Sequence, residues 1–251
     1  MCTLIIATRL VSSVPLFGIH NRDEKLSRAS TAPGRWVRNG QEILAPRDEK
    51  AGGSWVALNQ SGVFAGITNR YQSPSLEHHR SRGELVLLAT EEENAQEGMK
   101  RILALSGALY PGFHLFIADQ EKAYVIVNLE SELYCFELPP GLYVLTERSF
   151  QRGHSHRLDW LSTELLAFQD RFREEKRFGK SERRELGEWM TRTLESNPLE
   201  GTCIQIPGVD YGTRCSTWVE LGEGARRLLF APGPPCSTPY EEYTTPRAWA
   251  F

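Results

Sequence analysis

The chain has 251 residues and a formal net charge of −3, and 40% of its residues are hydrophobic. A chain of this length hides roughly 70–75% of the surface that its unfolded form exposes, so it can fold without metal or disulfide staples. The small negative charge gives no electrostatic basis for binding a nucleic-acid backbone, and we expect no nucleic-acid partner.

The first third of the chain is predicted to form strands, and helices follow. Apolar runs at residues 4–8, 14–20, 55–58 and 63–68 predict four strands, and the turn at residues 59–62 joins the last two into a hairpin. Ser81-x-x-Glu84 and Thr90-x-x-Glu93 match the capping box that begins a helix, so we expect two consecutive helices.

The rest of the chain repeats this order. Runs at residues 113–118, 123–129, 133–138 and 142–146 predict a meander of four strands. Apolar residues then recur at steps of three and four in residues 158–172 and 186–194, which predicts two amphipathic helices. Strands at residues 214–221 and 226–230 close a single domain of residues 1–231, and the Pro-rich residues 232–251 are predicted to form a tail.

The order of the predicted elements indicates the fold class. Strands and helices come in separate runs, which favours antiparallel sheets covered by helices over a strict βαβ alternation. We therefore predict an α+β fold, a four-layer αββα sandwich of two mainly antiparallel sheets.

The cysteines and the apolar runs bear on the cellular location. The five cysteines are widely spaced and form no CxxC pair, so the sequence suggests neither a disulfide framework nor a zinc site. We expect reduced thiols and a cytoplasmic location. The N-terminal region lacks a basic segment before its apolar run, and no apolar stretch approaches the roughly 20 residues of a membrane-spanning helix. We expect no signal peptide and no integral membrane association.

Cys2 has an unusual position, because removal of Met1 would make it the first residue. It would then carry a thiol and a free α-amine whose unperturbed pKa of about 7.7–8.0 leaves part of it unprotonated at neutral pH. Nucleophile and base would belong to one residue. The alternative interpretation is a small buried cysteine at the end of a strand.

Four polar residues, Asn21-Arg22-Asp23-Glu24, follow the apolar run of the second predicted strand. On a strand, Asn21 and Asp23 face one side, and Arg22 and Glu24 face the other. Asp23 would hold the ammonium form of the N terminus, and Arg22 would favour thiolate over thiol. The alternative is a solvated hairpin tip with a local ion pair.

Several short motifs between Cys2 and about Leu221 resemble those of the NRDE family, which is named after this tetrad and includes the transport-and-Golgi-organisation protein 2 homologues. The framework is similar, more distantly, to the choloylglycine hydrolase and acid-ceramidase-like branch of N-terminal-nucleophile hydrolases. The resemblance implies an αββα sandwich with an amidase-like site centred on a cysteine. Its motifs are Met1-Cys2-Thr3, the tetrad, Gly52-Gly53-Ser54-Trp55, Thr68-Asn69-Arg70, Ser81-Arg82-Gly83 and Tyr211-Gly212-Thr213-Arg214.

The resemblance also implies roles for the matching residues. Cys2 would be the nucleophile, Asp23 the partner of its amine, and Asn69 the donor of an amide N–H to a developing oxyanion. Arg214, like Arg22, would lie near the thiol and stabilise negative charge. The residues expected to bind substrate are Asn21, His20, Trp55 and Thr68.

Two positions depart from the hydrolase pattern. His20 stands where the hydrolases have an arginine three residues before the aspartate. The run Leu145-Thr146-Glu147-Arg148 stands where they have an asparagine. A carboxylate at Glu147 would repel an oxyanion, which counts against hydrolysis.

The sequence leaves two functions open. The first is a cysteine N-terminal hydrolase that cleaves a non-peptide C–N amide bond through a thioester. The second, which the resemblance implies, is a non-catalytic binding or trafficking protein for haem or for acyl-lipid or acyl-coenzyme A. Haem would need an axial ligand, for which Cys2, His20 and His114 are candidates. We expect an apolar or amphipathic small molecule as partner, no resident cofactor and no metal site. The sequence does not indicate the oligomeric state.

Overall fold

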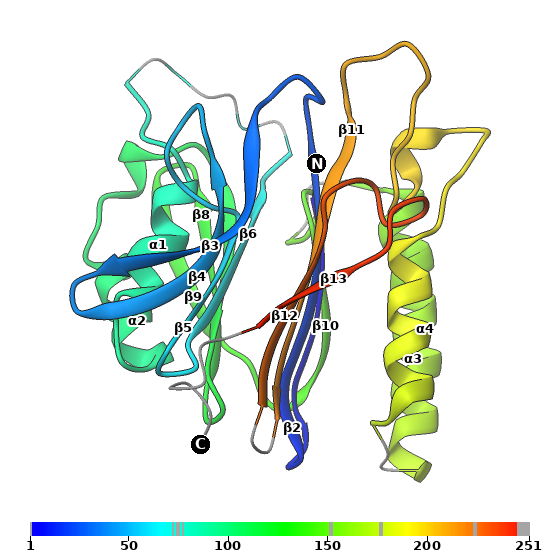
Figure 1. Cartoon of the computed structure of the whole chain (residues 1–251), viewed down its shortest axis with the longest axis horizontal. Coiled ribbons are helices and arrows are strands. Elements are labelled where there is room, and N and C mark those ends of the chain that lie inside the picture. The colour runs from blue at the N-terminus through cyan, green and yellow to red at the C-terminus, as the bar shows by residue number, and fades with distance from the viewer. Residues whose placement is uncertain are drawn as a thin grey trace.

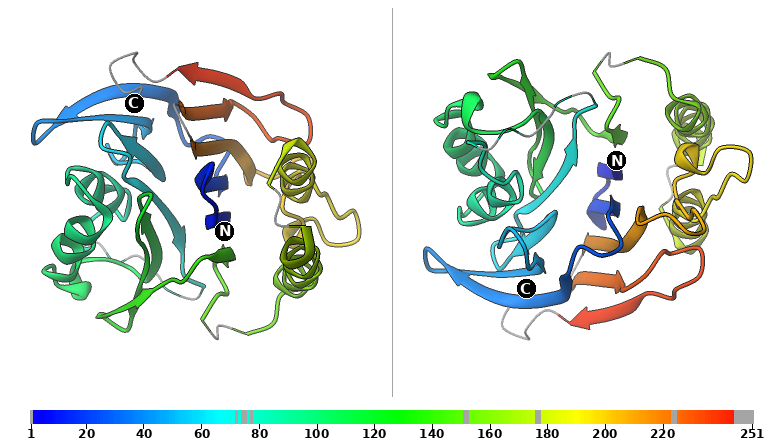
Figure 2. Two further views of the ribbon diagram at one scale, coloured as in Figure 1. Left: turned by 90° about the horizontal axis from the view of Figure 1, so that it is seen from below. Right: turned by 90° about the horizontal axis from the view of Figure 1, so that it is seen from above.

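The computed structural model describes residues 2–71, 73, 76, 78–150, 153–175, 178–222 and 225–244. Two antiparallel sheets face each other, with helices α1 and α2 on the outer face of one and α3 and α4 on the outer face of the other (Figures 1 and 2). This arrangement confirms the predicted four-layer αββα sandwich. The N terminus lies near one end of the sandwich, on a central strand of its sheet.

The six-stranded sheet contains the strand that begins at Cys2. Its order is β10-β1-β2-β11-β12-β13, so β1 and β2 are interior strands. Its members are β1 (Cys2–Val11), β2 (Val14–Glu24), β10 (Gly141–Thr146), β11 (Gly212–Gly222), β12 (Ala225–Ala231) and β13 (Glu241–Thr244).

The seven-stranded sheet runs in sequence order from β3 to β9. Its first two strands were not predicted. β3 is an edge strand with one buried residue among nine, so it carries little apolar signal. β4 is largely buried, but its apolar run at residues 43–45 is only three residues long before Pro46. Its members are β3 (Ser30–Arg38), β4 (Gln41–Asp48), β5 (Val56–Asn59), β6 (Phe64–Asn69), β7 (Phe113–Ala118), β8 (Ala123–Leu129) and β9 (Glu132–Glu137).

The four predicted α-helices are present, but both predicted capping boxes are wrong. The first helix begins after Arg82 without a side-chain cap. The second is capped by Asn94, whose side chain accepts the Glu97 N–H. Thr90 still belongs to the first helix, and its hydroxyl donates to the Val86 carbonyl 3.0 Å away. The helices are α1 (Gly83–Thr90), α2 (Ala95–Leu103), α3 (His156–Glu175) and α4 (Lys180–Met190), with 3₁₀ turns η1 (Gly107–Leu109) and η2 (Pro198–Glu200).

Two other expectations about the strands are corrected. The predicted meander pairs only as far as β9, because β10 crosses to the other sheet and pairs with β1. Part of the predicted tail is a strand, since β13 pairs with β12 and extends the six-stranded sheet. The Tyr240 hydroxyl anchors the approach to β13 by a 2.7 Å hydrogen bond with Ser216. Trp249 and Phe251 lie outside the described residues.

The continuous apolar run in β1 reflects burial of both its faces. Leu4 and Ile6 pack into the core between the two sheets, whereas Ile5 and Ala7 pack against α3 and α4. Successive side chains of a strand point to opposite faces, so a central strand of a four-layer fold needs apolar residues at every position. The position of Cys2 is thereby fixed by a strand buried on two sides.

One cysteine expectation is wrong. Cys203 and Cys236 form a disulfide across a sequence separation of 33 residues. The sequence did not indicate this pair because the chain after β12 folds back onto the loop that follows η2. Cys2, Cys135 and Cys215 are free thiols. Among the described residues, no helix is both long enough and apolar enough to cross a membrane.

Candidate active site

Cys2 begins β1, between β2 and β10. Its Cα pairs with that of Arg22, and the next residue, Thr3, pairs with Asn21 on one side and Thr146 on the other. The Cys2 thiol is 6% exposed and lies 4.0 Å from the main-chain oxygen of Asp23. Burial raises the pKa of the Cys2 thiol, so a nearby base or positive charge is needed to form thiolate at neutral pH.

The thiol opens into a cavity of about 570 Å³ between the ends of the two sheets. Predicted site residues that line it are Cys2, Arg22, Asp23, Trp55 and Asn69. Segments from β2, β4, β6 and the start of α1 meet here, and none of them adjoins Cys2 in sequence. The other lining residues are Glu24, Arg28, Asp48, Lys50, Ala51, Ser54, Ile67, Leu76, His79, Arg80, Ser81, Arg82, Gly83 and Pro111.

The alternation predicted for the tetrad is observed. The Asn21 side-chain amide donates to the main-chain oxygens of Met190 and Thr202, on the helical side of the sheet. Arg22 points to the other side, where its Nη2 donates to Asp48 at 2.8 Å. Its guanidinium also lies over the Trp55 ring, 4.4 Å from the centroid. These contacts hold Arg22 on the cavity wall.

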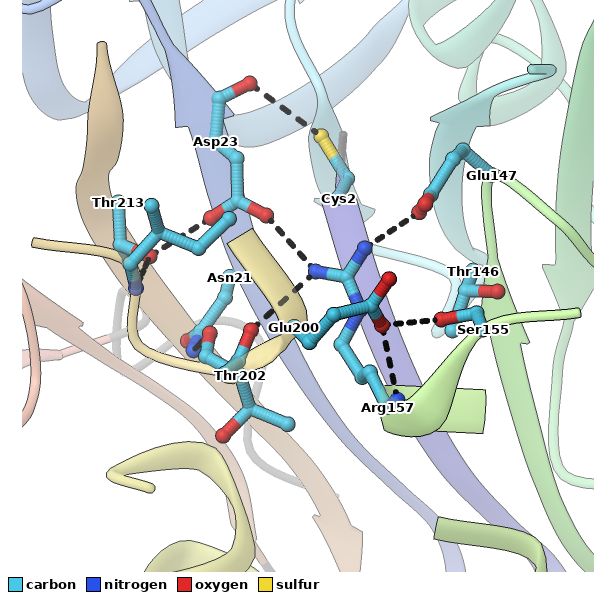
Figure 3. A network of polar contacts seen from close by, with 12 residues as sticks. Cys2, Asn21, Asp23, Thr146, Glu147, Ser155, Arg157, Glu200, Thr202 and Thr213 are labelled. Carbon is cyan, nitrogen blue, oxygen red and sulfur yellow. Dashed lines mark hydrogen bonds and ion pairs between the residues drawn. The ribbon is translucent and has the colours of Figure 1, made fainter. Parts of the chain in front are cut away.

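Asp23 belongs to a buried network of charges (Figure 3). Its Oδ1 accepts the Thr213 hydroxyl at 2.7 Å, and its Oδ2 accepts Arg157 Nη1 at 3.3 Å. Arg157 Nη2 donates to Glu147 at 2.6 Å, so one guanidinium bridges two carboxylates. Burial raises the pKa of Asp23 to about 6, against the opposing effect of Arg157.

Two motifs that are far apart in sequence dock through their glycines to build one cavity wall. The Ser54 N–H donates to the Gly83 carbonyl at 3.0 Å. A Cβ at Gly53 would lie 2.5 Å from the Gly83 carbonyl carbon, and one at Gly83 would lie 2.8 Å from the Ser54 oxygen. The backbones touch so closely that neither position has room for a side chain. This contact places Trp55 and Arg82 beside the thiol cavity.

A model of the family described as Transport and Golgi organisation 2 matches residues 1–226. The chain belongs to this family. A transport and Golgi organization protein 2 homolog from Bos taurus is 29% identical over 222 residues, which is 78% of either chain. One from Homo sapiens is 38% identical over 108 residues, covering 41% of this chain and 38% of that protein.

Solved structures share the four-layer fold of this member of the family. A variant of conjugated bile acid hydrolase from Clostridium perfringens superposes with a TM-score of 0.64 at 10% identity, covering 98% of both chains. A Caenorhabditis elegans ortholog of N-acylethanolamine-hydrolyzing acid amidase gives 0.58 at 14% identity, covering 98% of this chain and 100% of that chain. The superpositions show a shared fold, and at these identities they show the fold alone.

Three of the four residues that we expected to bind substrate are not among the described residues that line the cavity. His20 Nε2 contacts the Ile67 carbonyl at 2.9 Å, and Thr68 hydrogen-bonds His114 at 3.1 Å. Both side chains are buried, as is that of Asn21. Burial lowers the pKa of His20 to about 4 and that of His114 to about 3, so both rings are neutral at physiological pH. Here these residues hold the cavity walls together.

Arg214 is not among the described residues that line the thiol cavity. Its Nε donates to the Arg28 carbonyl at 3.3 Å. Its side chain lines a separate pocket of about 530 Å³, together with Leu26 and residues 204–213. A bulge in β11 between Thr213 and Cys215 interrupts the regular alternation at this residue, which a sequence pattern does not show.

Arg157, Thr213 and Arg82 belong to the site or its supporting network but were not predicted as site residues, and Glu147 has another environment than expected. Arg157 has no exposed surface, yet it lies in the first turn of α3 directly after Ser155 and His156, so its sequence surroundings resemble a solvated helix start. Glu147 was expected to face an oxyanion, but it is bound by Arg157 and does not line the cavity in the described part of the chain. Thr213 and Arg82 lie within family motifs, and this membership was the one feature of the sequence that could have marked them as site residues.

Proposed function

We propose that this chain is a cysteine N-terminal-nucleophile hydrolase of a non-peptide C–N amide bond, with Cys2 as nucleophile once Met1 is removed. The observation that carries the proposal is the position of the Cys2 thiol. It lies at the start of an interior strand, on the wall of a cavity, and 4.0 Å from Asp23 O. The family and the fold agree with this chemistry, and the names of both solved neighbours denote hydrolysis.

The proposed reaction uses groups that meet at this cavity. The free amine of Cys2 accepts the thiol proton, and the thiolate attacks the amide carbonyl carbon. The Asn69 side-chain amide donates to the oxyanion that develops. The C–N bond then breaks, and the ammonium of Cys2 returns a proton to the leaving amine. Water hydrolyses the resulting thioester, which releases the acid and restores the thiol.

The charges of the cavity indicate what the substrate carries. Cationic lining residues outnumber acidic ones, and the acids Glu24 and Asp48 are already paired with Arg22 and Arg28. Arg82 instead donates to the main-chain oxygen of Gly112. An amide with an anionic group on its polar side would match this surplus of positive charge. We therefore favour an amphipathic substrate over a wholly apolar one.

The test begins with the mass of the purified protein, which reports whether Met1 is absent. Acyl amides are then screened in pairs that differ only by a free or methyl-esterified carboxylate. We expect turnover of the free acids, a thioester adduct on Cys2, and a loss on the order of 10³-fold or more in Cys2→Ala and Cys2→Ser. Cys135→Ser is the matched control and should keep full activity. A processed N terminus with neither adduct nor turnover would count against catalysis.

The binding function is the second candidate, because the same cavity would hold an acyl-lipid, acyl-coenzyme A or haem without reaction. Of the three candidate haem ligands, Cys2 lines the cavity, whereas His20 and His114 are buried in contacts with Ile67 and Thr68. A haem-binding function would therefore use Cys2. A hemin titration should then shift the Soret band in the wild type and leave it unshifted in Cys2→Ala.

The cytoplasmic location remains part of the proposal. The sequence indicated this location because its five cysteines were expected to be reduced. The Cys203–Cys236 disulfide counts against that expectation for two of the five. Cell fractionation with a thiol-trapping reagent would test the compartment and the redox state together.

A further inference from the structure

The polar network behind Cys2 joins two buried carboxylates through one buried arginine. Asp23 and Glu147 are both buried, and the guanidinium of Arg157 bridges them at 3.3 and 2.6 Å. Glu147 has a second cation, Arg148, 3.9 Å away on a more exposed side chain, so Asp23 is the carboxylate that shares its buried arginine with another acid. Buried charges in proteins are normally compensated. The amine that processing would create at Cys2, beside Asp23, is a suitable partner in its ammonium form.

Contacts with Glu200 and Gly201 hold Arg157 in place, so its guanidinium stays between the two carboxylates. Its main-chain N–H donates to Glu200 at 3.0 Å, and the Ser155 hydroxyl donates to the same Glu200 oxygen at 2.7 Å. Its Nη1 also contacts the Gly201 carbonyl at 3.4 Å. The start of α3 and the end of η2 therefore fix the guanidinium between β2 and the end of β10 (Figure 3).

Asp23 is equally constrained. Its two oxygens are engaged by different elements, Oδ1 by Thr213 of β11 and Oδ2 by Arg157 of α3. The Asp23 carboxylate is therefore held in one orientation, in a residue whose main-chain oxygen lies 4.0 Å from the Cys2 thiol. Loss of the Arg157 contact would free one oxygen and remove the nearest buried positive charge.

We propose that Arg157 is a positioning residue for the reaction at Cys2, which keeps Asp23 ionised and oriented toward the Cys2 amine while neutralising Glu147. This inference rests on the proposed function. It also accounts for the carboxylate at Glu147, because a glutamate bound to an arginine presents an overall neutral pair behind the site. Arg157 acts through Asp23 and does not line the cavity.

Other titratable groups act on Asp23 and must be held constant in a test. Arg157 lowers its pKa and Glu147 raises it. Tyr211, in the segment before β11, and Cys215 of β11 also interact electrostatically with Asp23 and Cys2. The titratable groups that interact electrostatically with Asp23 are thus Cys2, Glu147, Arg157, Tyr211 and Cys215, with Glu200 bound to the main chain of Arg157 and Arg22 next to Asp23 in sequence.

The test measures the pKa of Asp23 directly, by carbon-13 NMR of protein labelled at aspartate carboxyls, with Asp23→Asn to assign the signal. Arg157→Met should raise this pKa by about 1 to 3 units, because a nearby opposite charge is removed. Glu147→Gln should lower it. The double variant R157M/E147Q restores the wild-type net charge and should return the pKa toward the wild-type value. Arg157→Lys keeps the charge and should stay within about one unit.

A structural role alone would not produce this pattern of opposite shifts and rescue. An unchanged Asp23 pKa in a folded Arg157→Met protein would overturn the proposal, as would a double variant that shows no return. If Arg157→Met does not fold, Glu147→Gln and the double variant still test the proposal. An unchanged or raised Asp23 pKa in Glu147→Gln would also contradict the proposed role of Arg157. If hydrolysis is detected, the acid limb of kcat/KM should move with the Asp23 pKa. The titration does not depend on turnover, so failure of the hydrolase proposal and failure of this one are separable.

Discussion

Asp23 is the residue whose ionisation matters most to this site. It lies in the buried network with Arg157 and Thr213, and burial raises its pKa from 3.8 to about 6. A carboxyl that titrates near 6 is ionised at neutral pH and protonated at mildly acidic pH. The ability of Asp23 to hold an ammonium at Cys2 should therefore weaken as the pH falls below about 6.

The same shift predicts how stability depends on pH. The folded protein binds the Asp23 proton more tightly than the unfolded chain, so the folded state loses relative stability as the pH rises from about 4 to 6. Relative to Asp23→Asn, the free energy of unfolding of the wild type should fall over this range by on the order of 3 kcal/mol. Urea unfolding of both proteins at a series of pH values measures this difference in the free energy of unfolding.

Asp210 provides the matched control for this measurement. Hydrogen bonds from Ser27 lower the pKa of the Asp210 carboxyl. The wild type should therefore gain stability relative to Asp210→Asn as the pH rises through the low range, which is the opposite sign. A flat or rising profile for Asp23 would contradict its raised pKa.

At the scale of elements, the cavity depends on the glycine contact between the segment after β4 and the start of α1. Asp48 closes the turn before it, since its Oδ1 accepts the Lys50 and Ala51 N–H groups and its Oδ2 accepts Arg22 and Arg28. Gly52, with φ of 73°, supplies the left-handed conformation that this turn requires. The two family motifs that contain Gly53 and Gly83 are thus explained by one backbone contact.

We predict that Gly53→Ala and Gly83→Ala each lower the free energy of unfolding by about 1–3 kcal/mol, because the added methyl group meets rigid backbone. Gly34→Ala in β3 is the matched control. Its Cβ would meet no atom within 4 Å, so its stability should change little. Urea denaturation of the three variants gives the comparison. Equal stability of all three would show that the two segments can separate without loss.

At the scale of the whole molecule, the segment after β12 adds the edge strand of the six-stranded sheet and is linked covalently to the loop after η2. β13 pairs with β12, and the Cys203–Cys236 disulfide fastens this segment to the loop after η2. That loop carries Thr202, whose main-chain oxygen accepts the Asn21 amide, and Ile204, whose N–H donates to Thr213. The covalent link therefore supports the strand ends that hold Asp23.

We predict that Cys236→Ser, or treatment of the wild type with a thiol reductant, lowers the free energy of unfolding by about 2–4 kcal/mol, because a closed loop restricts the unfolded chain. Cys135→Ser should be as stable as the wild type and should respond to reductant in the same way. Unfolding curves in urea with and without reductant measure both effects. No response of the wild type to reductant would contradict a stabilising disulfide.

The sequence alone determined the local elements and the class of fold. Apolar runs and periodicity indicated β1, β2, the β5–β6 hairpin and helices α3 and α4, because these elements bury one or both faces. Helices α1 and α2 were predicted from capping boxes that the structure does not contain. It also marked Cys2 and the alternation of Asn21 and Asp23 against Arg22, which follows from strand geometry. The edge strand β3, whose polar residues face solvent, gave no comparable signal.

Only the tertiary structure decided which residues surround the thiol. Arg157 pairs with Asp23 across 134 positions, and Cys203 meets Cys236, through contacts that no local pattern records. The bulge at Arg214 in β11 is likewise set by strand pairing. Charges buried far apart in sequence must find partners in three dimensions, and so the electrostatics of this site belong to the packing of its layers.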